Sequence, residues 1–122
     1  MSCDNLWIEQ RGLTHVYVAI SGTYCKIGAT LNVRKRMRAL NYQSGFFNDG
    51  KIVLVQSWKC RWPIEVEARV RKALGKPARG LDWYAVSKTR AVKAVRAAVR
   101  EVEAEYASLA RMVELRGGRS AR

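Results

Sequence analysis

The sequence predicts an α+β fold (α/β content), in which a small mixed or antiparallel β-sheet of three to four strands is flanked by helices and followed by a long C-terminal helix. Short β-branched and aromatic runs alternate with segments whose apolar residues recur every three or four positions. The last segment keeps this helical spacing over three heptads. With 122 residues, the chain is long enough for one hydrophobic core, and we expect a single compact unit.

The first two strands form a predicted hairpin. Residues 14–20 (THVYVAI) and 24–30 (YCKIGAT) are rich in strand-forming residues, and Ser21-Gly22-Thr23 between them is a turn signal. From Leu31 the spacing becomes helical, with apolar residues at Val33, Met37 and Leu40. Either Leu31 or Asn32 can cap this helix.

The middle of the chain predicts a strand, a helix and a short strand. Residues 51–58 (KIVLVQSW) form a nearly continuous apolar run, which is typical of a central or well-covered strand. Pro63 is well placed to open a helix over 63–74, since proline is tolerated in the first turn. Glycine and proline residues end that helix and lead into a short strand over 81–86.

The final helix is predicted over residues 88–116 and carries an unbroken apolar stripe between residues 92 and 113. The stripe has two readings with the same period: it packs on the sheet, or it pairs with a second copy in a homodimer through residues 92–113. The expected organisation is thus a lead over 1–12, a domain over 13–87, the helix over 88–116 and a flexible basic tail over 117–122.

Charge points to a polyanionic partner. The chain holds 23 Lys and Arg against 10 Asp and Glu, and the excess is concentrated in residues 11–100, where 19 basic residues face 4 acidic ones. Such a potential attracts phosphate, and nucleic acid is the favoured partner, with a merely solubilising surface as the alternative. No apolar run approaches the ~20 residues of a membrane span, so we expect no membrane partner. With no visible leader and three widely spaced cysteines, a cytoplasmic location is expected.

Several motifs resemble those of a known nuclease superfamily. In chain order these are Val16-Tyr17, Lys26-Ile27-Gly28, Thr30, Arg36, Glu67 and Gly80-Leu81-Asp82-Trp83-Tyr84. Their order and spacing over residues 13–87 resemble the GIY-YIG nucleases, and most closely the T5orf172 or Meiotically-up-regulated-gene-113-like branch, in which the second motif commonly reads KIG. The resemblance implies a GIY-YIG-like catalytic domain that acts as a DNA endonuclease.

The resemblance implies a catalytic set of Tyr17, Lys26, Arg36 and Glu67. Tyr17 would act as general base or orient the water if nearby cations lower the pKa of its phenol. Lys26 would stabilise a phenolate or the developing charge, and Arg36 offers a planar fork of donors for a phosphate. Glu67 is the candidate ligand for one Mg²⁺ or Mn²⁺ that keeps most of its waters.

Each assignment has a plainer alternative. Tyr17 could be a packed strand aromatic, Arg36 one of several interchangeable helix cations, and Glu67 the salt-bridge partner of Arg71. Five further basic residues are expected to contact nucleic acid: Arg34, Lys35, Arg38, Arg71 and Lys72. Tyr24 and His15 are auxiliary candidates for the site.

The sequence departs from the family pattern where it has Lys26 for the second tyrosine, Leu40 for a histidine found in several members and Asp82 for a usual glutamate. These departures bear on turnover more than on binding. A metal-dependent endonuclease is therefore set against a non-catalytic nucleic-acid-binding or architectural module, and RNA stands beside DNA as a substrate.

Overall fold

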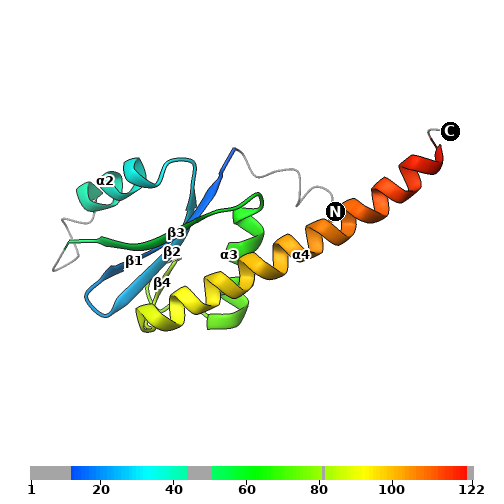
Figure 1. The fold of residues 1–122 in the computed structure, drawn as a ribbon. Helices are drawn as coiled ribbons and strands as arrows, with labels where there is room; N and C mark the ends of the chain where they lie inside the picture. The colour runs from blue at the N-terminus through cyan, green and yellow to red at the C-terminus, as the bar shows by residue number, and fades with distance from the viewer. Residues whose placement is uncertain (1–11, 44–50, 81, 121–122) are drawn as a thin grey trace.

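The computed structural model describes residues 12–43, 51–80 and 82–120, and their element order is β-β-α-β-α-β-α. The predicted fold class is confirmed: a four-stranded sheet is combined with helices, of which the last is long (Figure 1). The elements are β1 His15–Ser21, β2 Tyr24–Thr30, α2 Val33–Gln43, β3 Val53–Lys59, α3 Pro63–Leu74, β4 Trp83–Tyr84 and α4 Lys88–Ser120.

The sheet is antiparallel throughout and has the strand order β3-β1-β2-β4. β1 and β2 form the predicted hairpin, whose last pair is Ser21 with Tyr24. Gly22 lies in the turn at a φ of 60°, a conformation that glycine adopts without steric cost. β4 pairs with β2 only at Cys25 and Lys26, so most of that edge of β2 carries no strand in the described part of the chain.

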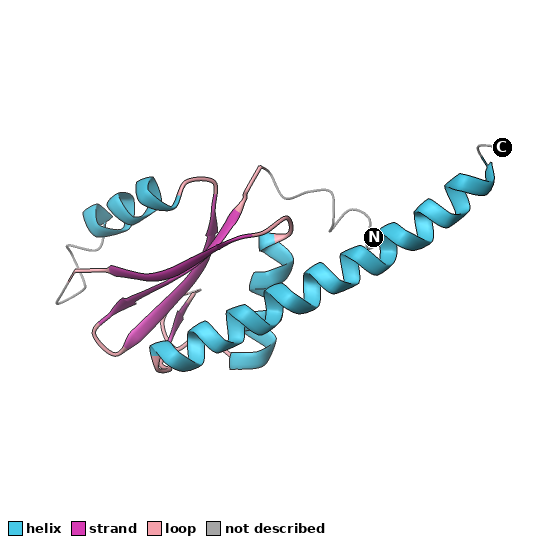
Figure 2. Cartoon of the chain, viewed as in Figure 1, coloured by secondary structure: helices cyan, strands magenta, loops and turns pink. Residues whose placement is uncertain are grey.

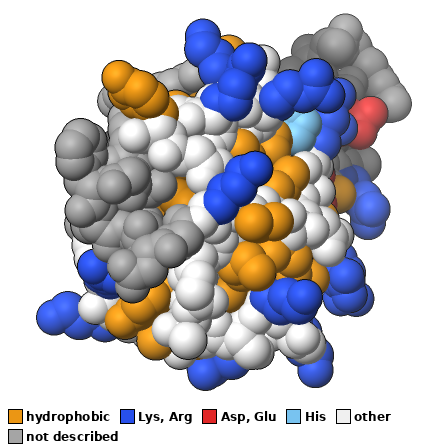
Figure 3. Space-filling model, turned by 90° about the vertical axis from the view of Figure 1, so that its left-hand side faces the viewer, with side chains coloured by type: hydrophobic (Ala, Val, Ile, Leu, Met, Phe, Trp, Pro, Cys, Tyr) orange, Lys and Arg blue, Asp and Glu red, His pale blue; other side chains and the backbone are white. Residues whose placement is uncertain are grey.

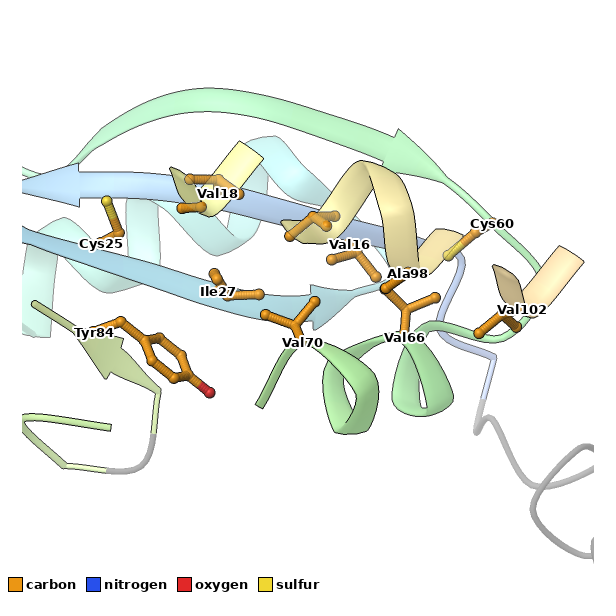
Figure 4. Close-up of a cluster of buried hydrophobic side chains, with 12 residues drawn as sticks. Val16, Val18, Cys25, Ile27, Cys60, Val66, Val70, Tyr84, Ala98 and Val102 are labelled. Carbon is orange, nitrogen blue, oxygen red and sulfur yellow. The ribbon is translucent and has the colours of Figure 1, made fainter. Parts of the chain in front are cut away.

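Helices cover both faces of the sheet. α2 lies on one face, and α3 and α4 lie together on the other (Figure 2). The larger core lies between the sheet and the α3–α4 layer, where Val66 and Val70 of α3 meet Val16 and Ile27 (Figure 4). The smaller core, under α2, contains Tyr17, Ala19, Leu40 and Ile52. Successive strand residues point to opposite faces, so the face of β1 that bears Tyr17 is the α2 face.

Local signals explain where α2 and α3 begin. The Asn32 side chain accepts a hydrogen bond from the backbone N–H of Lys35 at 3.0 Å, which makes Asn32 the residue that caps α2. α3 begins at Pro63, as expected, and proline needs no partner for the backbone N–H it lacks. Arg69 then ties α3 to α4 through ion pairs with Glu101 and Glu105.

Three predicted elements differ from the structure. β3 is an edge strand, not a central or well-covered one, because in the described part of the chain only β1 pairs with it, and Val53 on this strand is 51% exposed. The last strand is limited to Trp83–Tyr84. α4 continues to Ser120, four residues beyond its expected end at Arg116, so helix replaces most of the expected tail over 117–122.

The apolar stripe of α4 serves two different surroundings. Val95 and Val102 are fully buried in the larger core, which is the packing alternative. Farther along, Leu109 and Val113 are exposed on the part of the helix that extends away from the sheet (Figure 1). The surface that the homodimer alternative would use over 92–113 is therefore occupied within the domain along its first half. Among the described helices, none combines the length and apolar character needed to cross a bilayer.

Candidate active site

Tyr17 is fixed by a close approach to Gly28. The two residues are partners in the β1–β2 register, and the Tyr17 ring lies across the Gly28 backbone. A Cβ atom at position 28 would be 2.6 Å from the Tyr17 hydroxyl oxygen and 2.8 Å from the ring carbon that bears it. The glycine of the KIG motif is therefore a steric requirement for this position of the phenol.

Arg36 reaches the phenol from α2. Its Nε donates a hydrogen bond to the Tyr17 hydroxyl oxygen at 3.4 Å. Each residue turns a helix by about 100°, so Arg34 and Arg38, two positions to either side, point away from this contact. The geometry thus distinguishes Arg36 from its basic neighbours.

The protonation of Tyr17 differs from what cations alone would produce. The side chain is only 1% exposed, and this burial raises the pKa of the phenol above 10.0, although Arg36 lowers it. The carboxylates of Asp82 and Glu67 raise the pKa further. The expectation that surrounding cations lower the Tyr17 pKa is wrong, because desolvation is the larger effect.

Lys26 is buried and pairs with β4. Its ammonium lies 3.6 Å from the Asp82 carboxylate and 5.4 Å from the centre of the Trp83 ring. Burial lowers the pKa of Lys26, while Asp82 opposes that change. Lys26 lies opposite Ala19 in the β1–β2 register, and Ala19 is two residues from Tyr17 on β1, so Lys26 and Tyr17 share a sheet face. The group that the Lys26 ammonium contacts, however, is the Asp82 carboxylate.

Glu67 reaches the site from the opposite layer by way of the sheet edge. Its neighbour Val66 is buried in the core under α3, whereas Glu67 is half-buried and accepts a backbone hydrogen bond from Ala29 of β2. The short β4 leaves that edge of β2 open to a side chain. Burial, followed by the Asp82 carboxylate, raises the pKa of Glu67 from 4.5 to about 7. Arg71 and Lys26 act in the opposite direction.

Glu67 offers a single carboxylate to a divalent cation. The described residues contain no group of three or more His, Cys, Asp or Glu side chains that could enclose a metal. Glu67 is instead a single carboxylate whose ionised form is disfavoured by burial and by Asp82, and a nearby positive charge would relieve both effects. Mg²⁺ and Mn²⁺ accept such a site when water and substrate oxygens supply the other ligands.

A family model for the T5orf172 domain matches residues 14–103, which is most of the chain. The chain belongs to the T5orf172 domain family. Membership indicates a nuclease-related or DNA-binding role. No curated protein and no solved structure matches the chain significantly. The match extends past residue 87, where the motif resemblance ends, into the part of α4 that contributes Val95, Ala98 and Val102 to the core.

The other candidate residues of this T5orf172 domain are distributed over several surfaces. Arg34, Lys35 and Arg38 are exposed on α2, the helix that supplies Arg36. Arg71 contacts Asp82 at 3.4 Å and therefore borders the site. Lys72 lies elsewhere, in a hollow shared with Glu65 and Glu101 beside α4.

The two auxiliary candidates are also separated. His15 is two residues before Tyr17 on the same sheet face, and its Nδ1 is 2.8 Å from the Thr14 hydroxyl. Tyr24 shares the face of Lys26, as expected, but its ring partner is Arg79, at 5.5 Å. Glu65 pairs with Arg69 at 3.0 Å, so it lies on a different side of α3 from Glu67.

Asp82 is a site residue that the sequence does not single out. It pairs with Lys26 and Arg71, and its charge raises the pKa of both Tyr17 and Glu67. The scarcity of acidic residues is the signal that could have identified Asp82, because residues 11–100 contain only four of them.

Proposed function

We propose that this chain is a metal-dependent endonuclease that hydrolyses phosphodiester bonds in DNA. The main support is that Arg36 of α2 donates a hydrogen bond to the Tyr17 hydroxyl of β1, while the charge of Glu67 on α3 raises the pKa of the same phenol. Three elements thus contribute a guanidinium that bonds to the phenol and a carboxylate whose charge raises the pKa of that phenol, which supports the proposal. The charge of +13 and the family membership support a polyanionic substrate.

In this proposal Arg36 binds a non-bridging oxygen of the scissile phosphate, because its fork of donors matches phosphate and stays charged at any relevant pH. Tyr17 accepts a hydrogen bond from the attacking water and orients it. Its raised pKa keeps the phenol protonated at neutral pH, so we assign it orientation rather than proton removal. The water oxygen bonds to phosphorus and releases a proton to solvent, while the departing oxygen leaves and takes up a proton.

Glu67 would hold the divalent cation, Mg²⁺ or Mn²⁺. When bound, the cation supplies Lewis-acid stabilisation of the charge that develops on the phosphate oxygens. Asp82 forms ion pairs with Lys26 and Arg71. In this proposal it positions Lys26 and keeps the pKa of Glu67 raised.

A second candidate function is a nucleic-acid-binding module without turnover. The burial of Tyr17 favours it, since the ring is part of the smaller core and its hydroxyl is covered by Arg36. The endonuclease proposal requires Arg36 to shift toward the substrate phosphate, which uncovers the hydroxyl. The two functions therefore differ in what happens after binding.

Nicking of supercoiled plasmid DNA tests the proposal. The wild-type chain is compared in Mg²⁺, in Mn²⁺ and in EDTA with two variants of α3. Glu67→Gln should bind DNA and fail to nick it, whereas Glu65→Gln, the matched control, should nick because Glu65 pairs with Arg69 away from the site. DNA binding by the wild type without nicking in either metal would establish the binding module instead.

A further inference from the structure

A groove of about 620 Å³ lies between α2 and β3, and we call it the α2–β3 groove. Its apolar lining comes from Val33, Met37 and Leu54, and its cations are Arg34, Arg38 and Lys51. Met37 packs against the smaller core, whereas Leu54 is 39% exposed. The groove thus combines accessible apolar surface with three positive charges.

The charge of the groove restricts what can occupy it. None of the described residues that line it carries a carboxylate. By contrast, the hollow beside Arg69 contains Glu65 and Glu101. Figure 3 shows a face on which basic side chains border exposed hydrophobic groups and acidic side chains are scarce. An apolar surface bordered by cations complements a nucleobase with its flanking phosphates.

The groove adjoins the candidate site. Ser57, which lines it, is the register partner of Tyr17, and neighbouring strands lie about 4.8 Å apart. Leu54 pairs with Ala19 and therefore faces the same side of the sheet as Tyr17. α2 presents Arg36 to the phenol and Arg34 with Arg38 to the groove.

The end of the groove near β3 is held in place by Asn41. The Asn41 side chain accepts a hydrogen bond from the backbone N–H of Ile52 at 2.8 Å and donates one to the Ile52 carbonyl at 3.0 Å. These bonds fasten α2 to the start of β3. The spacing between the two walls is therefore set by the fold before any ligand binds.

We propose that the α2–β3 groove is a subsite for one unpaired nucleotide next to the scissile phosphate. The base would pack on Met37 and Leu54, and Arg34 and Arg38 would hold the adjacent phosphates. A base stacked in a duplex cannot offer its face to such a groove. The inference rests on the proposed endonuclease function and names its substrate class: DNA with an unpaired nucleotide at the cut, in preference to fully paired duplex.

Binding measured in EDTA tests the subsite separately from turnover. Fluorescence anisotropy compares a fully paired duplex with the same duplex carrying one bulged nucleotide. At about 25 cal/mol per Å² of apolar surface removed from water, covering a base face of on the order of 50 Å² corresponds to roughly tenfold in affinity, so the wild type should bind the bulged duplex about tenfold more tightly. Leu54→Ser should reduce that preference to about twofold.

Matched variants keep the test decisive. Val53→Ser is the control, because Val53 is exposed on the other face of β3 and should leave the preference intact. Arg38→Ala should lower the preference, whereas Lys35→Ala, which removes the same charge from another side of α2, should weaken both duplexes equally. Circular dichroism confirms that each variant is folded.

Equal wild-type affinity for both duplexes, or an unchanged preference in Leu54→Ser, would overturn the subsite. Nicking with no preference for the bulge sinks the subsite alone. Preference for the bulge with no nicking in Mg²⁺ or Mn²⁺ supports the subsite and sinks the endonuclease function.

Discussion

The carboxyl of Glu67 makes the free energy of unfolding depend on pH, and Glu67→Gln removes that dependence. Burial and Asp82 raise the pKa of Glu67 from 4.5 to about 7, and unfolding returns it to its ordinary value. Because the folded pKa is the higher one, this stabilising contribution is complete below pH about 4.5 and is lost as the pH rises through about 7. Ionised Glu67 therefore destabilises the fold at pH 8.

The magnitude follows from the pKa difference. The interval from 4.5 to about 7 corresponds to roughly 3 kcal/mol, at about 1.4 kcal/mol per pKa unit. Glu67 keeps partial contact with water, which screens its charge, so we expect about half of that. Glutamine has the same shape and still accepts the Ala29 hydrogen bond. Glu67→Gln should therefore stabilise the fold at pH 8 by ~1.5 kcal/mol, or about 5 °C in Tm.

Urea and thermal unfolding at pH 5 and pH 8 measure the effect. The advantage of Glu67→Gln should be present at pH 8 and small at pH 5, where Glu67 in the folded wild type holds its proton. Mg²⁺ at pH 8 should raise the Tm of the wild type and leave that of the variant unchanged. Glu65→Gln, which loses the ion pair with Arg69, should be no more stable than wild type at either pH. The reasoning fails if Glu67→Gln shows no gain at pH 8 or the same gain at both pH values.

Three further predictions concern other parts of the molecule. Gly28→Ala should lower the free energy of unfolding in urea by about 1–3 kcal/mol, because the added Cβ would lie 2.6 Å from the Tyr17 hydroxyl oxygen. Adding Tyr17→Phe, which removes that oxygen, should recover part of the lost stability. If it recovers none, the strain lies elsewhere. Arg36→Ala should abolish plasmid nicking, while Arg38→Ala should mainly weaken binding in a salt-dependent way; equal nicking defects would show that Arg36 is not special. The homodimer through residues 92–113 stays a prediction for the exposed second half of that range. Sedimentation should show a mass that rises with concentration, and Val113→Asp, at a position 69% exposed, should return it to that of the monomer. A monomer at every concentration contradicts the prediction.

Local patterns were enough to predict most of the fold. The hairpin, α2, α3 and α4 follow from residue spacing and from turn and cap residues such as Gly22, Asn32 and Pro63. The edge position of β3 could not be predicted, because an apolar run does not determine which strand will pair with it. In the structure that run divides: Val55 packs against the larger core, Ile52 lies in the smaller one, and Val53 is exposed.

The candidate site was predicted only in part, because some of its contacts depend on how distant segments pack together. The motif spacing selected Arg36, and the structure places its guanidinium on the Tyr17 hydroxyl. Asp82 could not be assigned its contacts with Lys26 and Arg71, since these depend on how the short β4 pairs with β2. The raised pKa of Tyr17 was also out of reach, because desolvation depends on the neighbours that close over the ring.

Because Glu67 reaches the site past the open edge of β2, the candidate site needs helices on both faces of the sheet. Glu67 belongs to a helix packed on one face of the sheet, whereas Arg36 belongs to a helix packed on the other. Detachment of either helix would separate Arg36 or Glu67 from the other groups of the site and would expose one of the two cores. The proposed hydrolysis thus requires the complete arrangement of α2, the sheet and the α3–α4 layer. A fragment or a partially unfolded chain would keep the positive charge that attracts phosphate but would lose that arrangement.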